Sequence, residues 1–199
     1  MIKKASVTYP IHELIQNRWS PYRFTDQAVS NEDLLSLFEA ARWAPSSYNE
    51  QPWRYILATK RQPEEFKKIL SCLLEGNQVW ARHAYALVLA SASLTHERNG
   101  KDNQAALYDL GASVAYLSLE AVSRGISVHQ IIGINPDIAR DIYKIPSDYR
   151  TLTAFAIGIV GAGEKETNDM YAERDNTARA RNDISKFVYM AEWESPWTE

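Results

Sequence analysis

Apolar residues recur along this chain in two patterns, helical spacing and short continuous runs, and the two patterns alternate. The clearest helix is predicted over residues 103–124 and ends at Gly125. Its apolar positions step by three and four residues, which places them on one helix face: Leu107, Leu110, Val114, Leu117 and Ala121. The alternation predicts a fold that combines helices with a sheet.

Capping residues and local composition predict the other elements. Shorter helices are expected over residues 11–17, 31–43, 63–75 and 137–144. Ser30 with Asp33 resembles a capping arrangement, Asn135 precedes a proline at the first helical position, and Gly76 is expected to cap its helix in the left-handed conformation. Strands are expected over residues 53–59, 85–90, 126–132 and 153–160.

The composition changes after residue 160. Residues 161–182 are mostly Glu, Asp, Asn and Arg, and we expect a surface excursion there. Residues 184–190 return to strand-like composition, and a strand after such a polar arm is expected to pair with a second subunit. The length fits one domain over 1–199, with 161–199 as a C-terminal arm that reaches the partner.

Charge and cysteine usage narrow the function classes. The 22 basic residues against 25 acidic ones give a net charge of −3, which argues against nucleic-acid binding. A single cysteine, Cys72, excludes an internal disulfide framework and a Cys-rich zinc site, and it is expected to be buried. We see neither an apolar run of membrane-spanning length nor a signal peptide, so we expect a cytoplasmic protein without a membrane partner.

The sequence offers arginines rather than a glycine loop for phosphate. The glycines at 158–163 follow a predicted strand, but their spacing and the polar residues after them do not fit a dinucleotide-binding loop. Arg18 and Arg23 lie in an irregular segment, and Arg179 and Arg181 stand two residues apart. Guanidinium groups suit phosphate because they bind it bidentately and stay charged, although most surface arginines are only solvated.

Two further segments are candidates for a site. Residues 44–53, APSSYNEQPW, place hydroxyls and amides between prolines, which suits either a polar heterocycle or an ordinary turn. His129 lies in an apolar run at 125–133 and is more often packed than catalytic in such surroundings. The histidines show no metal-binding spacing, so neither a hydrolase triad nor a metal site is expected.

Taken together, these segments resemble the FMN-dependent nitroreductase family. Residues 44–53 closely match its Ala-Pro-Ser-x-x-Asn-x-Gln-Pro-Trp signature, and residues 18–24 are similar to its Arg-x-Ser-x-basic-x-Phe opening. The stretches 109–112 and 128–133 follow its central helix and flavin-edge loop, and Arg179-x-Arg181 is similar to its C-terminal basic pair. The resemblance runs from about residue 10 to the end of the chain.

The resemblance implies an α+β fold, in which a central mixed, mostly antiparallel sheet is flanked by helices and a C-terminal extension is exchanged between the subunits of a dimer. It also implies a set of FMN-binding residues: Arg18, Trp19, Ser20, Tyr22, Pro45, Ser46, Ser47, Asn49, Gln130, Ile131, Ile132, Gly133, Arg179 and Arg181. The loop at 45–49 would reach the flavin of the partner subunit. Tyr22 stands where the family commonly has a basic residue, and Arg23 is the candidate replacement.

The implied activity is that of an NAD(P)H-dependent FMN oxidoreductase. Hydride would pass from NADPH or NADH through flavin N5 to nitroaromatics, quinones or similar electron-poor acceptors by a ping-pong mechanism, without a catalytic side chain from the protein. Two alternatives stay open: a flavin-binding redox protein without nitroreductase turnover, and a relative that performs reductive dehalogenation or flavin cleavage. In the second alternative, the polar residues 164–175 are the candidate lid.

Overall fold

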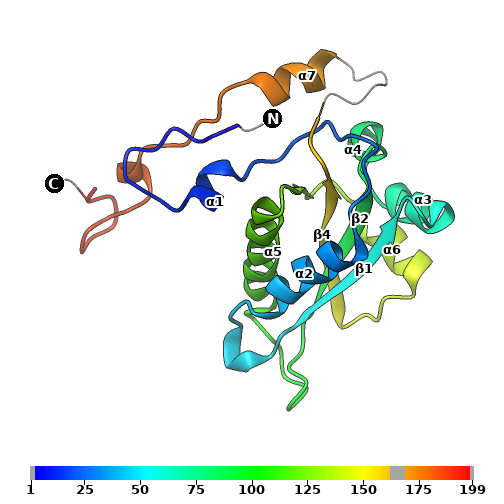
Figure 1. Ribbon diagram of the computed structural model, residues 1–199. Helices are drawn as coiled ribbons and strands as arrows, with labels where there is room; N and C mark the ends of the chain where they lie inside the picture. The colour runs from blue at the N-terminus through cyan, green and yellow to red at the C-terminus, as the bar shows by residue number, and fades with distance from the viewer. Residues whose placement is uncertain (1–2, 162–168, 198–199) are drawn as a thin grey trace.

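A computed structural model describes residues 3–161 and 169–197. The elements follow each other in the chain as α1 Glu13–Asn17, α2 Asn31–Arg42, η1 Ser47–Asn49, β1 Trp53–Thr59, α3 Pro63–Ser71, α4 Glu75–Ala81, β2 Ala86–Ser93, α5 Ala106–Ser123, β3 Ser127–Ile131, α6 Pro136–Tyr143, β4 Tyr149–Gly158, α7 Asp169–Asn176 and η2 Ile184–Lys186 (Figure 1). This arrangement confirms the expected α+β class.

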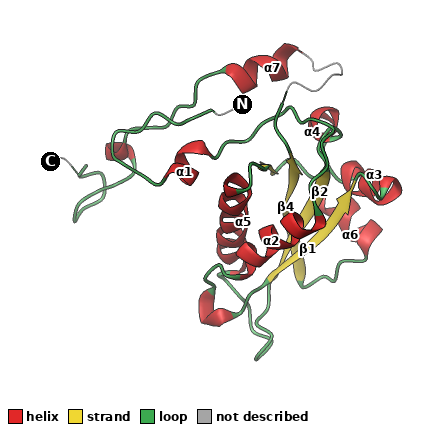
Figure 2. Ribbon diagram, in the orientation of Figure 1, coloured by secondary structure: helices red, strands yellow, loops and turns green. Residues whose placement is uncertain are grey.

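The strands form one sheet in the order β1-β2-β4-β3, and every pairing among the described residues is antiparallel (Figure 2). The parallel component of the expected mixed sheet is not found among these residues. The central strands β2 and β4 are buried almost throughout, which explains their continuous apolar runs. A strand covered on both faces has no polar face to alternate with.

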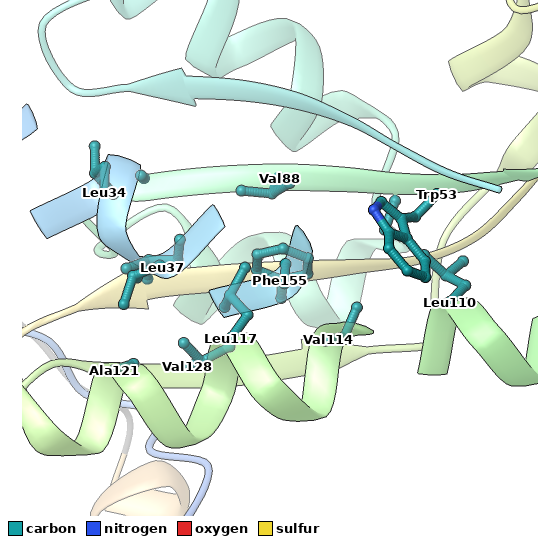
Figure 3. Packing of buried hydrophobic residues seen from close by; sticks show 14 of the residues in the cluster. Leu34, Leu37, Trp53, Val88, Leu110, Val114, Leu117, Ala121, Val128 and Phe155 are labelled. Carbon is teal, nitrogen blue, oxygen red and sulfur yellow. The ribbon is translucent and has the colours of Figure 1, made fainter. Parts of the chain in front are cut away.

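Helices cover both faces of the sheet. Alternate residues of β2 belong to different cores: Val88 and Ala90 pack with α2 and α5, whereas Leu87 and Leu89 pack with α3, α4 and α6. Figure 3 shows the first core, in which Phe155 of β4 lies among side chains of α2 and α5. The predicted stripe on α5 faces this core, so the strongest sequence pattern is the one that positions the central helix.

The expected helix over 63–75 with a cap at Gly76 is wrong. The helix α3 ends at Ser71, and α4 begins at Glu75 and contains Gly76. The break is held by residues far along the chain, because the backbone N–H groups of Leu74 and Asn135 donate to the carbonyls of Gly133 and Cys72. Tertiary hydrogen bonds therefore outweigh local helical preference at this point.

Two expectations for the C-terminal part also fail. Residues 184–190 form no strand; a 3₁₀ turn capped by Asp183 begins at Ile184 instead. The region 161–182 is not only a surface excursion, since α7 carries two buried side chains, Tyr171 and Asp175; residues 162–168 lie outside the described part. Beyond α7 the chain runs beside the N-terminal segment, away from the sheet (Figure 1). Exchange of this arm with a partner stays a prediction.

Candidate functional site

Three arginines from opposite ends of the sequence come together beside α1. Arg18 is the residue that ends this helix, and its guanidinium donates to the hydroxyl of Ser20 at 3.2 Å. Arg179 reaches the same region, because its Nη1 donates to the carbonyls of Lys3 at 3.1 Å and of Gln16 at 2.5 Å. Arg181 lies close enough for its charge to act on both other arginines. We call Arg18, Ser20, Arg179 and Arg181 the arginine cluster.

The arginine cluster carries positive charge without a carboxylate partner. Within residues 3–161 and 169–197, no Asp or Glu forms an ion pair with any of its three arginines. Burial, followed by the charges of Arg179 and Arg181, lowers the pKa of Arg18 below its usual value. A bound anion would stabilise this arrangement, because it would offset the repulsion among the three guanidiniums.

The segment after α1 is anchored by aromatic packing. Trp19 is buried, and the ammonium of Lys3 lies 5.0 Å from the centroid of its ring. Tyr22 also points into the protein, where its ring contacts those of Trp80, His129 and Tyr171 at centroid distances of 5.1, 4.6 and 5.2 Å. The side chain of Tyr22 is thus part of an aromatic cluster.

Arg23 does not take the place of the missing basic residue in the arginine cluster. Its Nε donates to Asp175 at 3.2 Å, and the side chain of Asp175 is only 1% exposed. Since a buried carboxylate binds the guanidinium of Arg23, that charge is already compensated. In this structure neither Tyr22, which packs among aromatic rings, nor Arg23, which pairs with Asp175, adds an uncompensated positive charge to the arginine cluster.

The loop at 44–53 is fixed to the start of α5. The N–H of Ser47 donates to the buried carboxylate of Asp109 at 3.1 Å, and the N–H of Gln51 donates to the hydroxyl of Ser46 at 3.0 Å. Tyr48, Asn49 and Gln51 all have positive φ angles, at 54°, 56° and 49°. Such a run of left-handed residues other than glycine is strained, and strain of this kind is concentrated at binding sites. Pro45 and Asn49 are exposed.

The end of β3 lies next to the segment 18–24. Nδ1 of His129 lies 2.8 Å from the carbonyl of Pro21, so this nitrogen donates, and burial lowers the pKa of the imidazole. Gln130 donates to Ser118 of α5 at 3.3 Å, while Ile131 is buried and Ile132 is 72% exposed. Gly133 adjoins Asn77, whose amide donates to its carbonyl at 3.0 Å.

Two of the three predicted groups of residues, 18–22 and 130–133, are therefore neighbours in the folded structure. Residues 130–133 continue from His129, which contacts the segment that carries Arg18 and Ser20. The third group, residues 45–49, lies apart at the N-terminal end of α5, whereas α1 lies towards the opposite end (Figure 1). A single chain does not bring the loop to the arginine cluster.

The model of one protein family, described as the Nitroreductase family, matches residues 15–159. The chain belongs to the nitroreductase family. The match covers α1 to β4 and includes most of the site, whereas Arg179 and Arg181 lie outside it. The family is one of oxidoreductases, so the expected family, fold and enzyme class are confirmed.

Three similar proteins illustrate the match. An uncharacterized 15.4 kDa protein of Mycolicibacterium smegmatis is 31% identical over 137 residues, which are 67% of this chain and 87% of that protein. The major NAD(P)H-flavin oxidoreductase of Aliivibrio fischeri is 29% identical over 102 residues, or 48% of this chain and 45% of its own length. A solved structure described as the oxidoreductase containing FMN is 28% identical, covers 96% of both chains and superposes with a TM-score of 0.89.

Sequence reasoning missed two acidic residues that hold this nitroreductase-family site. The sequence pattern places Asp109 only within a motif, although its carboxylate accepts from the N–H of Ser47 in the loop. It places Asp175 in a polar surface segment, although the residue is buried. The signal for Asp175 is its spacing, since it follows Tyr171 by four residues and so shares its helix face.

In the part of the chain that the structure describes, no helix is both long and apolar enough to cross a membrane.

Proposed function

We propose that this nitroreductase-family protein is an FMN-dependent oxidoreductase that passes hydride from NADH or NADPH through flavin N5 to nitroaromatics, quinones or similar acceptors in a ping-pong reaction. The observation that carries the proposal is the arginine cluster, whose three guanidiniums have no carboxylate partner among the described residues. The solved structure with FMN and the relative named as an NAD(P)H-flavin oxidoreductase support the choice of cofactor and reductant.

The residues present fit the phosphate end of FMN. Arg18 donates only one of its five N–H groups to a described partner, the hydroxyl of Ser20, so its planar end retains donors for phosphate oxygens. Arg179 is held by two backbone carbonyls, which fixes the direction of its side chain. We assign the phosphate and the ribityl chain to the arginine cluster, with the backbone of Trp19 beside it.

Residues 130–133 are assigned to the edge of the flavin ring. They adjoin the arginine cluster through His129 and Pro21, and the exposed Ile132 offers an apolar contact. The carbonyl of Gly133 accepts from the amide of Asn77 and from the backbone N–H of Leu74, both at 3.0 Å. These two hydrogen bonds orient the backbone at 133, which suits a donor aimed at a ring atom.

A second copy of the chain is proposed to complete the site. The strained loop at 45–49 lies away from the arginine cluster of its own chain. The face of α5 that turns away from the sheet exposes Tyr108 and Tyr116, which are 82% and 45% exposed. Exposed aromatic residues on a helix are typical of a protein interface. A homodimer that packs along α5 would bring the loop of one chain to the arginine cluster of the other.

Large exposed apolar side chains on the C-terminal arm support the proposed homodimer. Phe187, Met190, Trp193 and Trp197 are each more than half exposed. Side chains of this size are costly to leave in water, and a partner subunit would bury them. We therefore propose that the arm after α7 lies against the second copy.

In the proposed reaction the protein binds and orients the flavin, and it supplies no nucleophile. The arginine cluster would fix the phosphate end of FMN, and the loop at 45–49 would supply hydroxyl and amide groups at the ring. Ser46 and Ser47 are half-buried, and the loop conformation is fixed by Asp109, so their positions are set before a ligand binds. A cytoplasmic location remains a prediction.

A tagged heterodimer tests whether the site is shared between chains. One chain carries Arg18→Gln, which impairs the arginine cluster. The other carries Ser47→Trp, which places a large side chain on the loop at 45–49 and impairs its contact with the flavin. If the loop of each chain serves the arginine cluster of its partner, one site of the heterodimer keeps both parts intact, and the heterodimer binds about one FMN per dimer with the affinity of the wild type. If the loop and the arginine cluster of one chain form a site together, each site of the heterodimer carries one substitution, and no site of wild-type affinity remains. Each homodimeric variant is the control and should likewise lack such a site.

A further inference from the structure

Asp175 is buried at the junction between the two parts of the chain that supply the arginine cluster. Its carboxylate accepts three N–H groups: the backbone of Tyr22 at 2.9 Å, the backbone of Arg23 at 3.2 Å and Nε of Arg23 at 3.2 Å. Its side chain is 1% exposed and that of Arg23 is 11% exposed. A buried carboxylate with this many donors makes a strong and directional link.

The link joins segments that are 152 and 153 residues apart in sequence. On one side, Tyr22 lies two residues after Ser20 and four after Arg18. On the other side, Arg179 lies four residues after Asp175, and Arg181 lies six after it. The link therefore lies within a few residues of every member of the arginine cluster.

Something must oppose the repulsion among the three arginines before an anion is bound. Burial and the two neighbouring guanidiniums act against the charged form of Arg18, so an isolated arm would be pushed away from α1. The arm is tied back by contacts that involve Asp175, by the bonds of Arg179 to the carbonyls of Lys3 and Gln16, and by that of Lys3 to the carbonyl of Arg174. Among these ties, Asp175 is the one with a buried charge.

We propose that Asp175 is a positioning residue for the anion site: by binding the backbone at Tyr22 and Arg23, it holds the C-terminal arginines against Arg18 and Ser20. The inference rests on the proposed function, since it takes the phosphate of FMN as the anion. Asp175 itself does not touch the ligand. Its role is to bring two segments into the arrangement that binds it.

If Asp175 acted only through its charge, its removal would have the opposite effect on anion affinity to the one that a positioning role predicts. Asp175 is a negative charge near a phosphate site, so its removal should favour an anion if only charge mattered. Positioning predicts weaker binding, because the amide introduced by Asp175→Asn has no charge and a single acceptor oxygen, and so cannot accept from both Tyr22 and Arg23 as the two carboxylate oxygens do. The direction of the change in affinity therefore separates the two explanations.

The experiment compares FMN with riboflavin, which has the same ring and lacks the phosphate. Dissociation constants are measured by quenching of flavin fluorescence for the wild type, Asp175→Asn and Glu173→Gln. Glu173 is the matched control because it lies on the same helix and loses the same charge, but it is exposed. We expect FMN to bind about tenfold or more weakly to Asp175→Asn, with riboflavin unchanged and Glu173→Gln like the wild type.

Hydrogen exchange of the cofactor-free protein gives a second readout. At least one of the amides of Tyr22 and Arg23 should lose protection in Asp175→Asn, and both should keep it in Glu173→Gln, because the two carboxylate oxygens of Asp175 accept one N–H each from this backbone and Asn has only one such oxygen. This measurement does not depend on flavin. Unchanged protection, or FMN affinity equal to or above that of the wild type, would overturn the positioning role.

If Asp175→Asn does not fold, Asp175→Glu replaces it and is judged in the same way. Failure of both to fold would show that Asp175 is needed for the fold itself, which also contradicts a specific role at the anion site. Wild-type protein that binds FMN no better than riboflavin would instead contradict the proposed function, and the positioning role with it.

Discussion

Replacing Arg18 by Gln should reduce the preference for a phosphorylated flavin without unfolding the protein. In the described residues Arg18 donates only to Ser20, at 3.2 Å, and no carboxylate pairs with it. A bidentate guanidinium–phosphate contact consists of two charge-assisted hydrogen bonds worth about 1.5–3 kcal/mol each, and the amide of Gln can still donate in place of one of them. We therefore expect FMN to bind about 10- to 150-fold more weakly, with riboflavin affinity unchanged.

The same substitution has two opposing effects on the cofactor-free protein. Losing the hydrogen bond to Ser20 costs about 0.5–1.5 kcal/mol, while removing one of three like charges recovers a few tenths to about 1 kcal/mol. The melting temperature should thus change by less than about 3 °C.

Calorimetric titration with both flavins and thermal unfolding of the cofactor-free protein provide the assay. Arg42→Gln is the control, since Arg42 pairs with Glu39 on the surface of α2. Equal losses of FMN and riboflavin affinity, or a drop in melting temperature of many degrees, would refute the assignment of Arg18 to the phosphate.

Three further predictions concern stability. Leu37→Ala should destabilise the fold by about 2–5 kcal/mol because Leu37 is fully buried; Leu35→Ala, on the exposed side of α2, should cost less than about 0.5 kcal/mol in the same urea titration. Burial lowers the pKa of His129 below 6.5, so the unfolded state takes up the proton first and stability falls as the pH drops below 6.5. In His129→Gln, the free energy of unfolding from urea titrations between pH 5 and 8 should fall less steeply towards acid pH than in the wild type. An unchanged slope of this free energy against pH would contradict the prediction. Gly76→Ala should add about 0.5–1 kcal/mol within α4, whereas Gly125→Ala should cost about 1–2 kcal/mol because φ is 69°; melting temperatures that move in the same direction would count against this reasoning.

The sequence predicted the elements whose signals are local. The strand at 53–59 has the expected bounds, α5 lies within the expected helix, and Ser30 and Asn135 cap their helices as expected. In each case the deciding residues are near neighbours: an apolar stripe on one helix face, or a side chain that accepts from an N–H three residues on.

The failures arise where distant residues decide the structure. The break after α3 depends on hydrogen bonds to residues 133–135, which no local pattern shows. Residues 184–190 are strand-like in composition, but a strand also needs a partner to pair with, and in the described chain these residues form only an isolated bridge, between Tyr189 and Pro196. The exchange of this arm with a second subunit stays a prediction.

The same division applies to the candidate site. The motif at 44–53 pointed to the flavin loop, but the left-handed conformations of Tyr48 and Gln51 do not follow from their residue types. The convergence of Arg18 with Arg179 and Arg181 joins the two ends of the chain. The spacing of residues within either segment does not show that the two segments lie close together. It also does not identify Asp175 as the residue that links them.

The central claim is that this protein binds FMN and accepts hydride from a nicotinamide nucleotide. The most direct measurement is the visible absorption spectrum of the purified protein after incubation with FMN and removal of the excess, followed by anaerobic addition of NADH or NADPH. We expect flavin absorption that remains with the protein and bleaches when one of the nucleotides is added. Protein that retains no flavin after reconstitution, or bound flavin that neither nucleotide bleaches, would contradict this claim.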